Sequence, residues 1–133
     1  MRLKLEQYYS TIGPKDKGVS WETAVDWRWD SELVVDTATS RNGIPIRLTD
    51  ERWSHVIEEH TELAGFRLEV LETLTQPERI VEGLHGALLA VRAIGQGTWL
   101  VVVYREAVAD GFVITAFLTS NGKFLAKRRQ IWP

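Results

Sequence analysis

Two segments of the sequence combine an apolar pattern with side chains that can transfer protons or bind phosphate. The helix-like segment, residues 48–60, contains two of the three histidines. The strand-like segment, residues 113–123, contains a threonine among apolar residues and ends on a lysine. An imidazole titrates near neutral pH, and a nearby cation stabilises charge that develops on a phosphate. These residue types could together perform metal-free acid–base chemistry on a phosphodiester. The candidate catalytic residues are His55, His60, Thr115 and Lys123.

The two histidines of the first segment lie on different sides of the predicted helix. His60 falls on its apolar stripe, and His55 lies about 140° away at the 100° per residue of an α-helix. Both rings can face one atom only if the helix bends or ends early. His60 is either a core histidine bonded to a carbonyl group or a general acid or base. His55 shares a face with Glu59, which either orients the imidazole or forms a solvated pair with it.

The other candidates have ordinary structural explanations as well. Thr115 suits a strand whatever its chemistry, and it is predicted to share a strand face with Val113, Phe117 and Thr119. Lys123 follows a predicted turn and is either a phosphate-binding cation or an exposed one. His85 precedes a glycine at an expected hairpin tip and is interpreted as a turn residue.

Composition and missing motifs exclude several classes of protein. The chain has no cysteine, which excludes disulfides, thiolate zinc sites and cysteine nucleophiles. A P-loop and the GxGxxG and GxSxG motifs are absent, which argues against nucleotide hydrolysis and dinucleotide redox chemistry, and the helical zinc spacing HExxH is absent as well. A metal site from His55, Glu59 and one more ligand is the weakest alternative. We expect no metal and no cofactor.

The size and the distribution of charge suggest a small intracellular protein with one basic segment. The 133 residues suit one domain, and neither a signal peptide nor a membrane-spanning apolar run is present, so we expect a cytoplasmic location and no membrane contact. The net charge of −2 argues against binding nucleic acid by bulk charge. However, no acidic residue follows Asp110. The charged residues after it are all basic, namely Lys123, Lys127, Arg128 and Arg129. This basic segment is either an RNA-binding strip or a solvated tail. The candidate RNA-binding residues are Arg52, Arg105, Lys127, Arg128 and Arg129.

Hydrophobic periodicity and glycine turns predict the elements that must position these residues. We expect a helix whose N-cap is Thr49 or Asp50 and a second helix over residues 66–75, closed by Pro77. Four strands joined by short turns are expected to follow, and the third of them is expected to be covered on both faces. They cover residues 79–84, 87–94, 98–105 and 112–119. Residues 123–132 are a last strand or a tail. The prediction is an α+β fold with two helices packed on a four-stranded antiparallel meander sheet.

Residues 1–45 are predicted to be a β-leaning N-terminal extension of a domain formed by residues 46–133. Strands are expected at residues 2–9 and 32–37, with a loop at 13–18 and a turn at Asn42-Gly43. The tryptophans between residues 21 and 30 must pack on the main domain or on a second copy of the chain.

Residues 46–132 resemble the phage-associated barnase–EndoU–colicin–RelE-like (BECR-type) nuclease domains. The resemblance rests on the order and spacing of short motifs and covers about two thirds of the chain. These are the helix from Leu48-Thr49 through Arg52-Trp53-Ser54-His55-Val56 to His60-Thr61-Glu62-Leu63, the helix exit Thr75-Gln76-Pro77-Glu78, the strand Val101-Val102-Val103, the strand Ile114-Thr115-Ala116-Phe117-Leu118-Thr119, and Lys123.

The resemblance implies helices on a four-stranded antiparallel sheet, metal-independent RNA cleavage, and use as a toxin or phage-related effector with a protein antitoxin. By position, the polar sites of the family match His55, His60, Thr115 and Lys123. Relatives tend to have arginine where this chain has Glu59, so the phosphate clamp is expected from Arg52 or Arg105. The alternative to a ribonuclease is a non-enzymatic, homodimeric interaction module that uses the acidic helix face and the N-terminal tryptophans.

Overall fold

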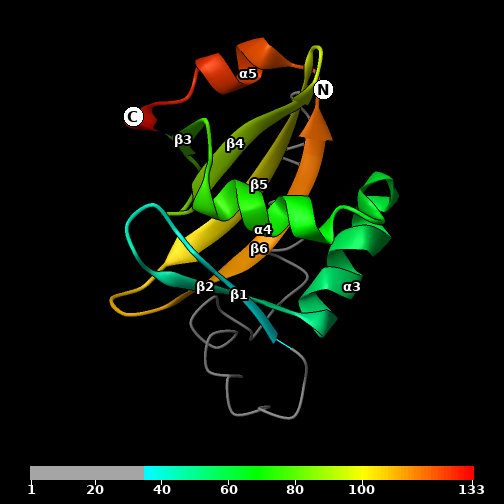
Figure 1. Cartoon of the computed structure of the whole chain (residues 1–133). Coiled ribbons are helices and arrows are strands. Elements are labelled where there is room, and N and C mark those ends of the chain that lie inside the picture. Colours follow the sequence, from blue (N-terminus) through cyan, green and yellow to red (C-terminus); the bar gives the residue numbers. More distant parts are fainter. Residues whose placement is uncertain (1–34) are drawn as a thin grey trace.

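Apolar runs separated by glycine turns form most of the sheet in the computed structural model, which describes residues 35–133 (Figure 1). In this part of the chain, seven strands form one sheet in the order β1-β2-β6-β5-β4-β3-β7. The strands are β1 (Val35–Thr39), β2 (Pro45–Thr49), β3 (Arg79–Glu82), β4 (Leu88–Gly95), β5 (Thr98–Glu106), β6 (Gly111–Thr119) and β7 (Gln130–Trp132). The helices are α3 (Asp50–Glu59), α4 (Arg67–Thr75), α5 (Gly122–Ala126) and the 3-10 helix η2 (Thr61–Leu63).

The predicted fold of two helices on a four-stranded antiparallel sheet is wrong. The four predicted strands exist as β3 to β6 and pair with one another in antiparallel order. However, β2 adds to β6 in parallel, β1 lies beyond β2, and β7 adds to β3. The sheet described here is therefore mixed and has seven strands. The sequence could not reveal the parallel pair, because it joins segments far apart along the chain.

A third α-helix, α5, begins where the sequence predicts a turn that leads into a strand or a tail. The Asn121 side-chain oxygen accepts the backbone N–H of Phe124 at 3.1 Å. This bond caps the first turn of a helix, so Asn121-Gly122 begins a helix and not the predicted turn. The chain then returns to the sheet as β7.

The described part of the predicted extension, residues 35–45, consists of β1 and the turn that joins it to β2. The turn at Asn42-Gly43 is confirmed, and Gly43 has a positive φ of 81°. The predictions for residues 2–9, 13–18 and 21–30 lie outside the described residues. The boundary at residue 45 stays a prediction, although β1 already belongs to the sheet.

The sheet buries side chains on both faces. In β5, Leu100, Val102 and Tyr104 face α3, η2 and α4, whose buried residues include Val56 and Leu74. The alternate residues of β5 face the opposite side, where Leu125 of α5 joins the apolar cluster. Residues 100–104 of β5 are all 0% exposed, which confirms that this strand is covered on both faces.

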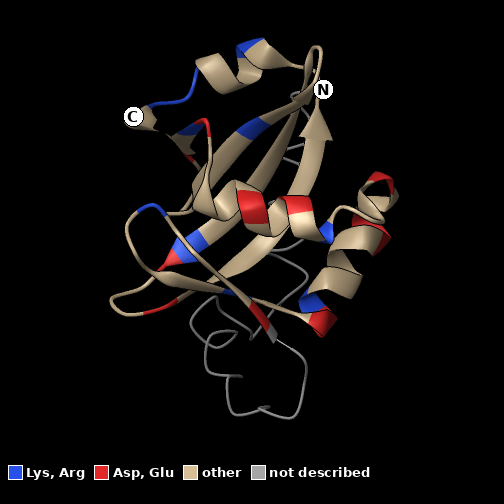
Figure 2. Cartoon of the chain, in the orientation of Figure 1, with Lys and Arg blue, Asp and Glu red and all other residues tan. Residues whose placement is uncertain are grey.

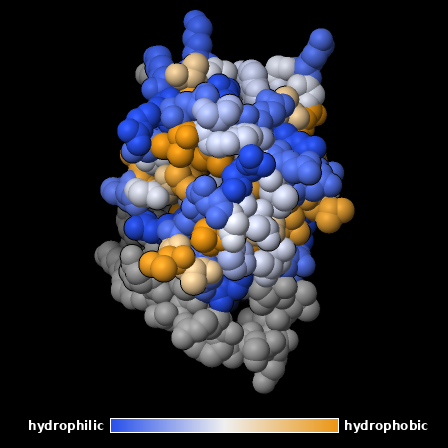
Figure 3. All heavy atoms as spheres, turned by 60° about the vertical axis from the view of Figure 1, so that its left-hand side comes forward, coloured by the Kyte–Doolittle hydropathy of each residue, from blue (hydrophilic) through white to orange (hydrophobic). Residues whose placement is uncertain are grey.

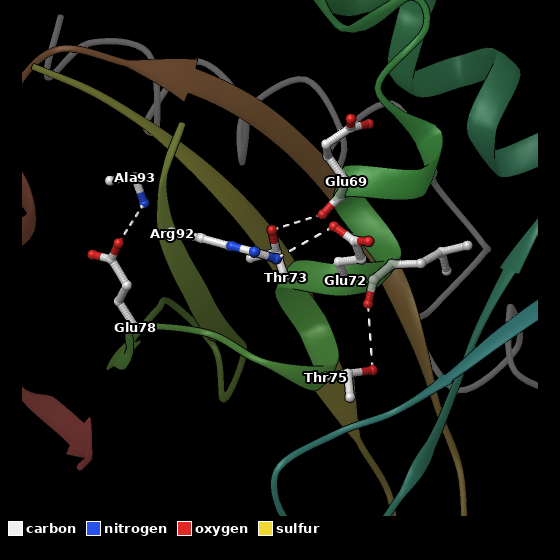
Figure 4. A network of polar contacts seen from close by, with 8 residues as sticks. Glu69, Glu72, Thr73, Thr75, Glu78, Arg92 and Ala93 are labelled. Atoms are coloured by element: carbon white, nitrogen blue, oxygen red, sulfur yellow. Dashed lines mark hydrogen bonds and ion pairs between the residues drawn. The ribbon is translucent and has the colours of Figure 1, made fainter. Parts of the chain in front are cut away.

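Helix starts and polar contacts fix the helical layer over the sheet. Thr49 is confirmed as the N-cap of α3, since its hydroxyl accepts the backbone N–H of Arg52 at 3.0 Å. Figure 4 shows α4 beside β4, where Arg92 and Glu72 approach to 3.5 Å. In the same view the Thr73 hydroxyl donates to the backbone oxygen of Glu69 at 2.7 Å. No helix within residues 35–133 is long and apolar enough to cross a membrane.

Strand β6 meets β2 only at its beginning. The registered pairs are Ile46 with Gly111 and Arg47 with Phe112. Beyond this point α3 and η2 lie along β6 (Figure 1). The junction of α3 and η2, which contains His60, therefore faces the later part of β6.

Candidate functional site

His60 lies at the junction between α3 and η2, where backbone hydrogen bonds fix its main chain. Helix α3 ends at Glu59, and His60 has the non-helical dihedral angles φ −136° and ψ 75°. Its backbone N–H donates to the oxygen of Val56 at 2.8 Å, and its own carbonyl oxygen accepts from Leu63 at 2.9 Å. The helix thus ends early, so the orientation of the His60 ring does not follow the helical spacing. A backbone bonded on both sides gives this imidazole a defined position.

The His60 ring lies against β6. Its centroid is 6.0 Å from that of Phe117, with the two planes at 38°. Its Nδ1 atom lies 3.6 Å from a carboxylate oxygen of Glu62 in η2. The residue is only 8% exposed, so neighbouring side chains must adjust before a large substrate can reach the ring. The surroundings of this imidazole therefore combine an aromatic ring and a carboxylate.

Thr115, a predicted site residue, lies on the same strand and strand face as Phe117. The register pairs Thr115 with Val103 and Phe117 with Val101, and these partners are alternate residues of β5. Thr115 is fully buried, and its hydroxyl donates to the backbone oxygen of Ala116 at 3.4 Å. Thr115 therefore lies two residues before Phe117, whose ring the His60 imidazole approaches.

One residue predicted on this face lies on the other one. The sequence predicted that Val113 shares a face with Thr115, but a bulge shifts the β5–β6 register between Val103 and Tyr104. Ile114 is the extra residue, so Val113 joins the cluster under the helices. Strict alternation of side chains cannot predict such an insertion.

Thr119 is a polar residue of this face that was not selected from the sequence. It pairs with Trp99, is 3% exposed, and accepts the backbone N–H of Asn121 at 3.1 Å through its hydroxyl. Its spacing of two and four residues from Phe117 and Thr115 was the available signal. Its hydroxyl ties the end of β6 to the start of α5.

His55 and Lys123 lie on the surface. The His55 side chain is 60% exposed, and its Nδ1 atom lies 3.6 Å from Glu58, not from the predicted partner Glu59. Lys123 is exposed in the first turn of α5. Of the four candidate catalytic residues, His60 and Thr115 are therefore buried, and His55 and Lys123 are exposed.

The candidate RNA-binding residues are distributed over several elements. Arg105 of β5 donates to the backbone oxygen of His85 at 2.7 Å. His85 has a positive φ of 57°, which agrees with its interpretation as a turn residue. Arg52 is partly buried in the first turn of α3.

The basic segment after α5 is tied to β3. Arg128 donates to the backbone oxygen of Glu82 at 2.6 Å, Arg129 lies 3.6 Å from the Glu82 carboxylate, and Lys127 is exposed. Figure 2 shows these basic residues away from the acidic residues of α3 and α4. The basic residues of this segment are therefore separate from the acidic helices but lie beside Glu82.

The metal site and the interaction module are the two alternatives that can be compared with the described part of the chain. Within residues 35–133, no three histidine or acidic side chains gather into a group that could hold a metal ion. The metal alternative therefore has no ligand set in this part of the chain. On the face shown in Figure 3, hydrophobic side chains outside the grey atoms occur in several small groups separated by hydrophilic ones.

Comparison of the chain with protein-family models, curated proteins and solved structures gives no match. The function is therefore inferred from the geometry around His60.

Proposed function

We propose that the protein is a metal-independent endoribonuclease with His60 as its central proton-transfer group. The observation that supports this most is the position of the buried His60 imidazole. It lies 6.0 Å from Phe117, on the strand that also carries Thr115. A titratable ring on a fixed backbone, next to a hydroxyl-bearing strand face, suits general acid–base chemistry.

In the proposed reaction His60 takes the proton of a ribose 2′-hydroxyl. The 2′-oxygen then forms a bond to phosphorus as the bond from phosphorus to the 5′-oxygen breaks. The products are a 2′,3′-cyclic phosphate and a free 5′-hydroxyl group. The 5′-oxygen takes its proton from a second donor, for which His55 and solvent water are the two candidates. No metal takes part in any step.

The remaining residues act on the phosphate. The Thr115 hydroxyl would exchange its bond to the Ala116 oxygen for one to a phosphate oxygen, and a cation would stabilise the charge of the pentavalent phosphorus. Lys123, Arg52 and Arg105 are the candidates for that cation. The basic segment after α5 would bind neighbouring phosphates of the RNA. The BECR resemblance extends the proposal to a toxin or phage-related effector in the cytoplasm, with an antitoxin protein as its partner.

The test is cleavage of labelled RNA in the presence of a chelator. We expect the wild type to produce cyclic-phosphate ends and His60→Ala to lose about 100-fold or more of the rate, the usual contribution of a general acid or base. His55→Ala, from the same helix, tests the second proton donor. A small loss in this variant assigns the second proton to water, and a loss as large as that of His60→Ala assigns it to His55. Unchanged cleavage by His60→Ala, or no cleavage by the wild type, would contradict the proposal.

A non-enzymatic interaction module is the second candidate. The observation that favours it is Leu68, which is 67% exposed on α4 next to the acidic Glu69. A homodimer that buries this side chain should dissociate in Leu68→Glu, measured as the mass of the full chain in solution. A monomeric wild type would remove the homodimer, and RNA cleavage that depends on His60 would favour the enzyme.

A further inference from the structure

A carboxylate and an aromatic ring lie next to the His60 imidazole. Glu62 Oε2 lies 3.6 Å from His60 Nδ1, and the Phe117 ring lies 6.0 Å from the imidazole. We propose that Glu62 is a positioning residue that holds the proton of His60 on Nδ1. The consequence for catalysis rests on the proposed ribonuclease activity, but the effect on the imidazole does not.

The backbone brings Glu62 to this place. Glu62 is the middle residue of η2, and the hydrogen bond from Leu63 to the His60 carbonyl, at 2.9 Å, closes that short helix directly after the histidine. The carboxylate therefore comes back toward the ring two residues after it. Since a single tight turn joins the two side chains, their relative position depends on few torsion angles.

A carboxylate beside Nδ1 selects one tautomer of a neutral imidazole. With the proton on Nδ1, the lone pair is on Nε2, and Nε2 becomes the nitrogen that can accept a substrate proton. When His60 takes up that proton the ring becomes positively charged, and the carboxylate stabilises the new charge. Glu62 would thus set both the tautomer before the reaction and the charge balance during it.

Burial distinguishes this pair from a second pair with the same separation. His55 Nδ1 also lies 3.6 Å from a carboxylate, that of Glu58, but those side chains are 60% and 74% exposed. The His60 and Glu62 side chains are 9% and 39% exposed. Water weakens an exposed ion pair and competes for its protons, so the His55 pair should order its imidazole little. The chain thus contains its own control.

The experiment measures the histidine tautomers of the full-length protein by 15N NMR at a pH of about 9, where free imidazoles are neutral. In the wild type we expect His60 to carry its proton on Nδ1. Glu62→Ala should move the proton toward Nε2, whereas Glu62→Gln keeps an acceptor and should retain the wild-type tautomer. Glu58→Ala, the matched control, should leave the spectrum of His60 unchanged. If His60 has the same tautomer in Glu62→Ala as in the wild type, Glu62 does not position it.

Kinetics with RNA provide the second measurement. Glu62→Ala should lower kcat by about 10- to 100-fold, the usual effect of removing a residue that orients a functional histidine, while KM changes less than about twofold. Glu62→Gln should recover part of this loss, because it orients the ring without supplying charge. A tautomer change in a protein that never cleaves RNA would support the positioning by Glu62 and contradict only the proposed function. Full activity of Glu62→Ala would overturn the positioning role in catalysis.

Discussion

The guanidinium group of Arg41 lies 4.3 Å from the ring centroid of Trp132, although β1 and β7 are the two outermost strands of the sheet. Arg41 belongs to the turn after β1, and Figure 1 shows that this turn and the C-terminus lie on the same side of the molecule. Glu106 fixes the turn on both sides of Arg41, because its carboxylate accepts from the Ser40 hydroxyl and, at 2.9 Å, from the Asn42 side chain. The turn therefore links the end of β5 to the C-terminal strand.

The Arg41–Trp132 contact should stabilise the fold measurably. A cation over an aromatic face is worth about 0.5–1 kcal/mol at partly exposed sites. A double-mutant cycle of Arg41→Ala and Trp132→Ala, measured by urea unfolding, should give a coupling free energy of that size. The control cycle uses Arg128 and Phe124, which lie farther apart at 5.8 Å and should couple less. Equal or zero coupling in both cycles would contradict a specific role for Arg41.

Gly111 should not tolerate a side chain. A Cβ atom at this position would lie 2.2 Å from the backbone oxygen of Arg105 and 2.7 Å from Ile46 Cδ1. Neither the β5 backbone nor the fully buried Ile46 can move freely, so Gly111→Ala should cost about 3 kcal/mol of unfolding free energy. Gly95→Ala is the control, since a Cβ there meets no heavy atom within 4 Å, and it should change stability by less than about 0.5 kcal/mol. Similar denaturant midpoints for the two variants would show that the strands adjust around the added methyl group.

Tyr104→Phe should not destabilise the protein at neutral pH. Tyr104 is 0% exposed, and its hydroxyl group has no hydrogen-bond partner among the described residues. A buried hydroxyl without a partner loses its contacts with water, so removing it should leave stability unchanged or raise it by about 1 kcal/mol. Urea unfolding at pH 7 measures this difference. A clear loss of stability would mean that the hydroxyl is bonded in solution.

Tyr104→Phe should also change how the stability of the protein responds to alkaline pH. Burial, assisted by the negative charge of Glu106, raises the pKa of Tyr104 above its ordinary value. The unfolded chain then loses this proton first, so stability falls as the pH rises above about 10, by about 1.4 kcal/mol per pH unit. Tyr104→Phe lacks this contribution and should lose less stability between pH 9 and pH 11. If the unfolding free energies of the two proteins fall in parallel over this pH range, the raised pKa of Tyr104 is contradicted.

Local sequence patterns predicted the individual helices and strands better than the way the strands pair in the sheet. The second helix was expected at residues 66–75 and occurs at Arg67–Thr75, because Pro77 and the apolar spacing define it locally. The four strands of the meander were predicted for the same reason, since short glycine turns join neighbours. The pairing of β2 with β6 depends on contacts between distant segments, and no local signal predicts it. The same holds for β7, whose place beside β3 becomes available only after α5 has reversed the chain.

The sequence suggested candidate residue types for a site but not how they lie relative to one another. It selected His60 and Thr115, and in the structure the His60 ring lies 6.0 Å from that of Phe117, two residues after Thr115 on β6. The helical spacing used for His60 did not apply, since α3 ends one residue earlier. Glu62 was not selected, because its approach to the ring depends on the tight turn of η2, which has no periodicity of its own.

The attachment of the β1–β2 turn has a consequence for the order of folding. The turn and its two strands are close in sequence and can form quickly, but Asn42 is bonded to Glu106, which lies 64 residues farther along the chain. Closing so long a loop is slow compared with forming a hairpin. We therefore expect the hairpin to form early and to attach to the meander only after β5 has been made. The histidine that follows β2 and α3 would then reach Phe117 of β6 in one of the last steps of folding.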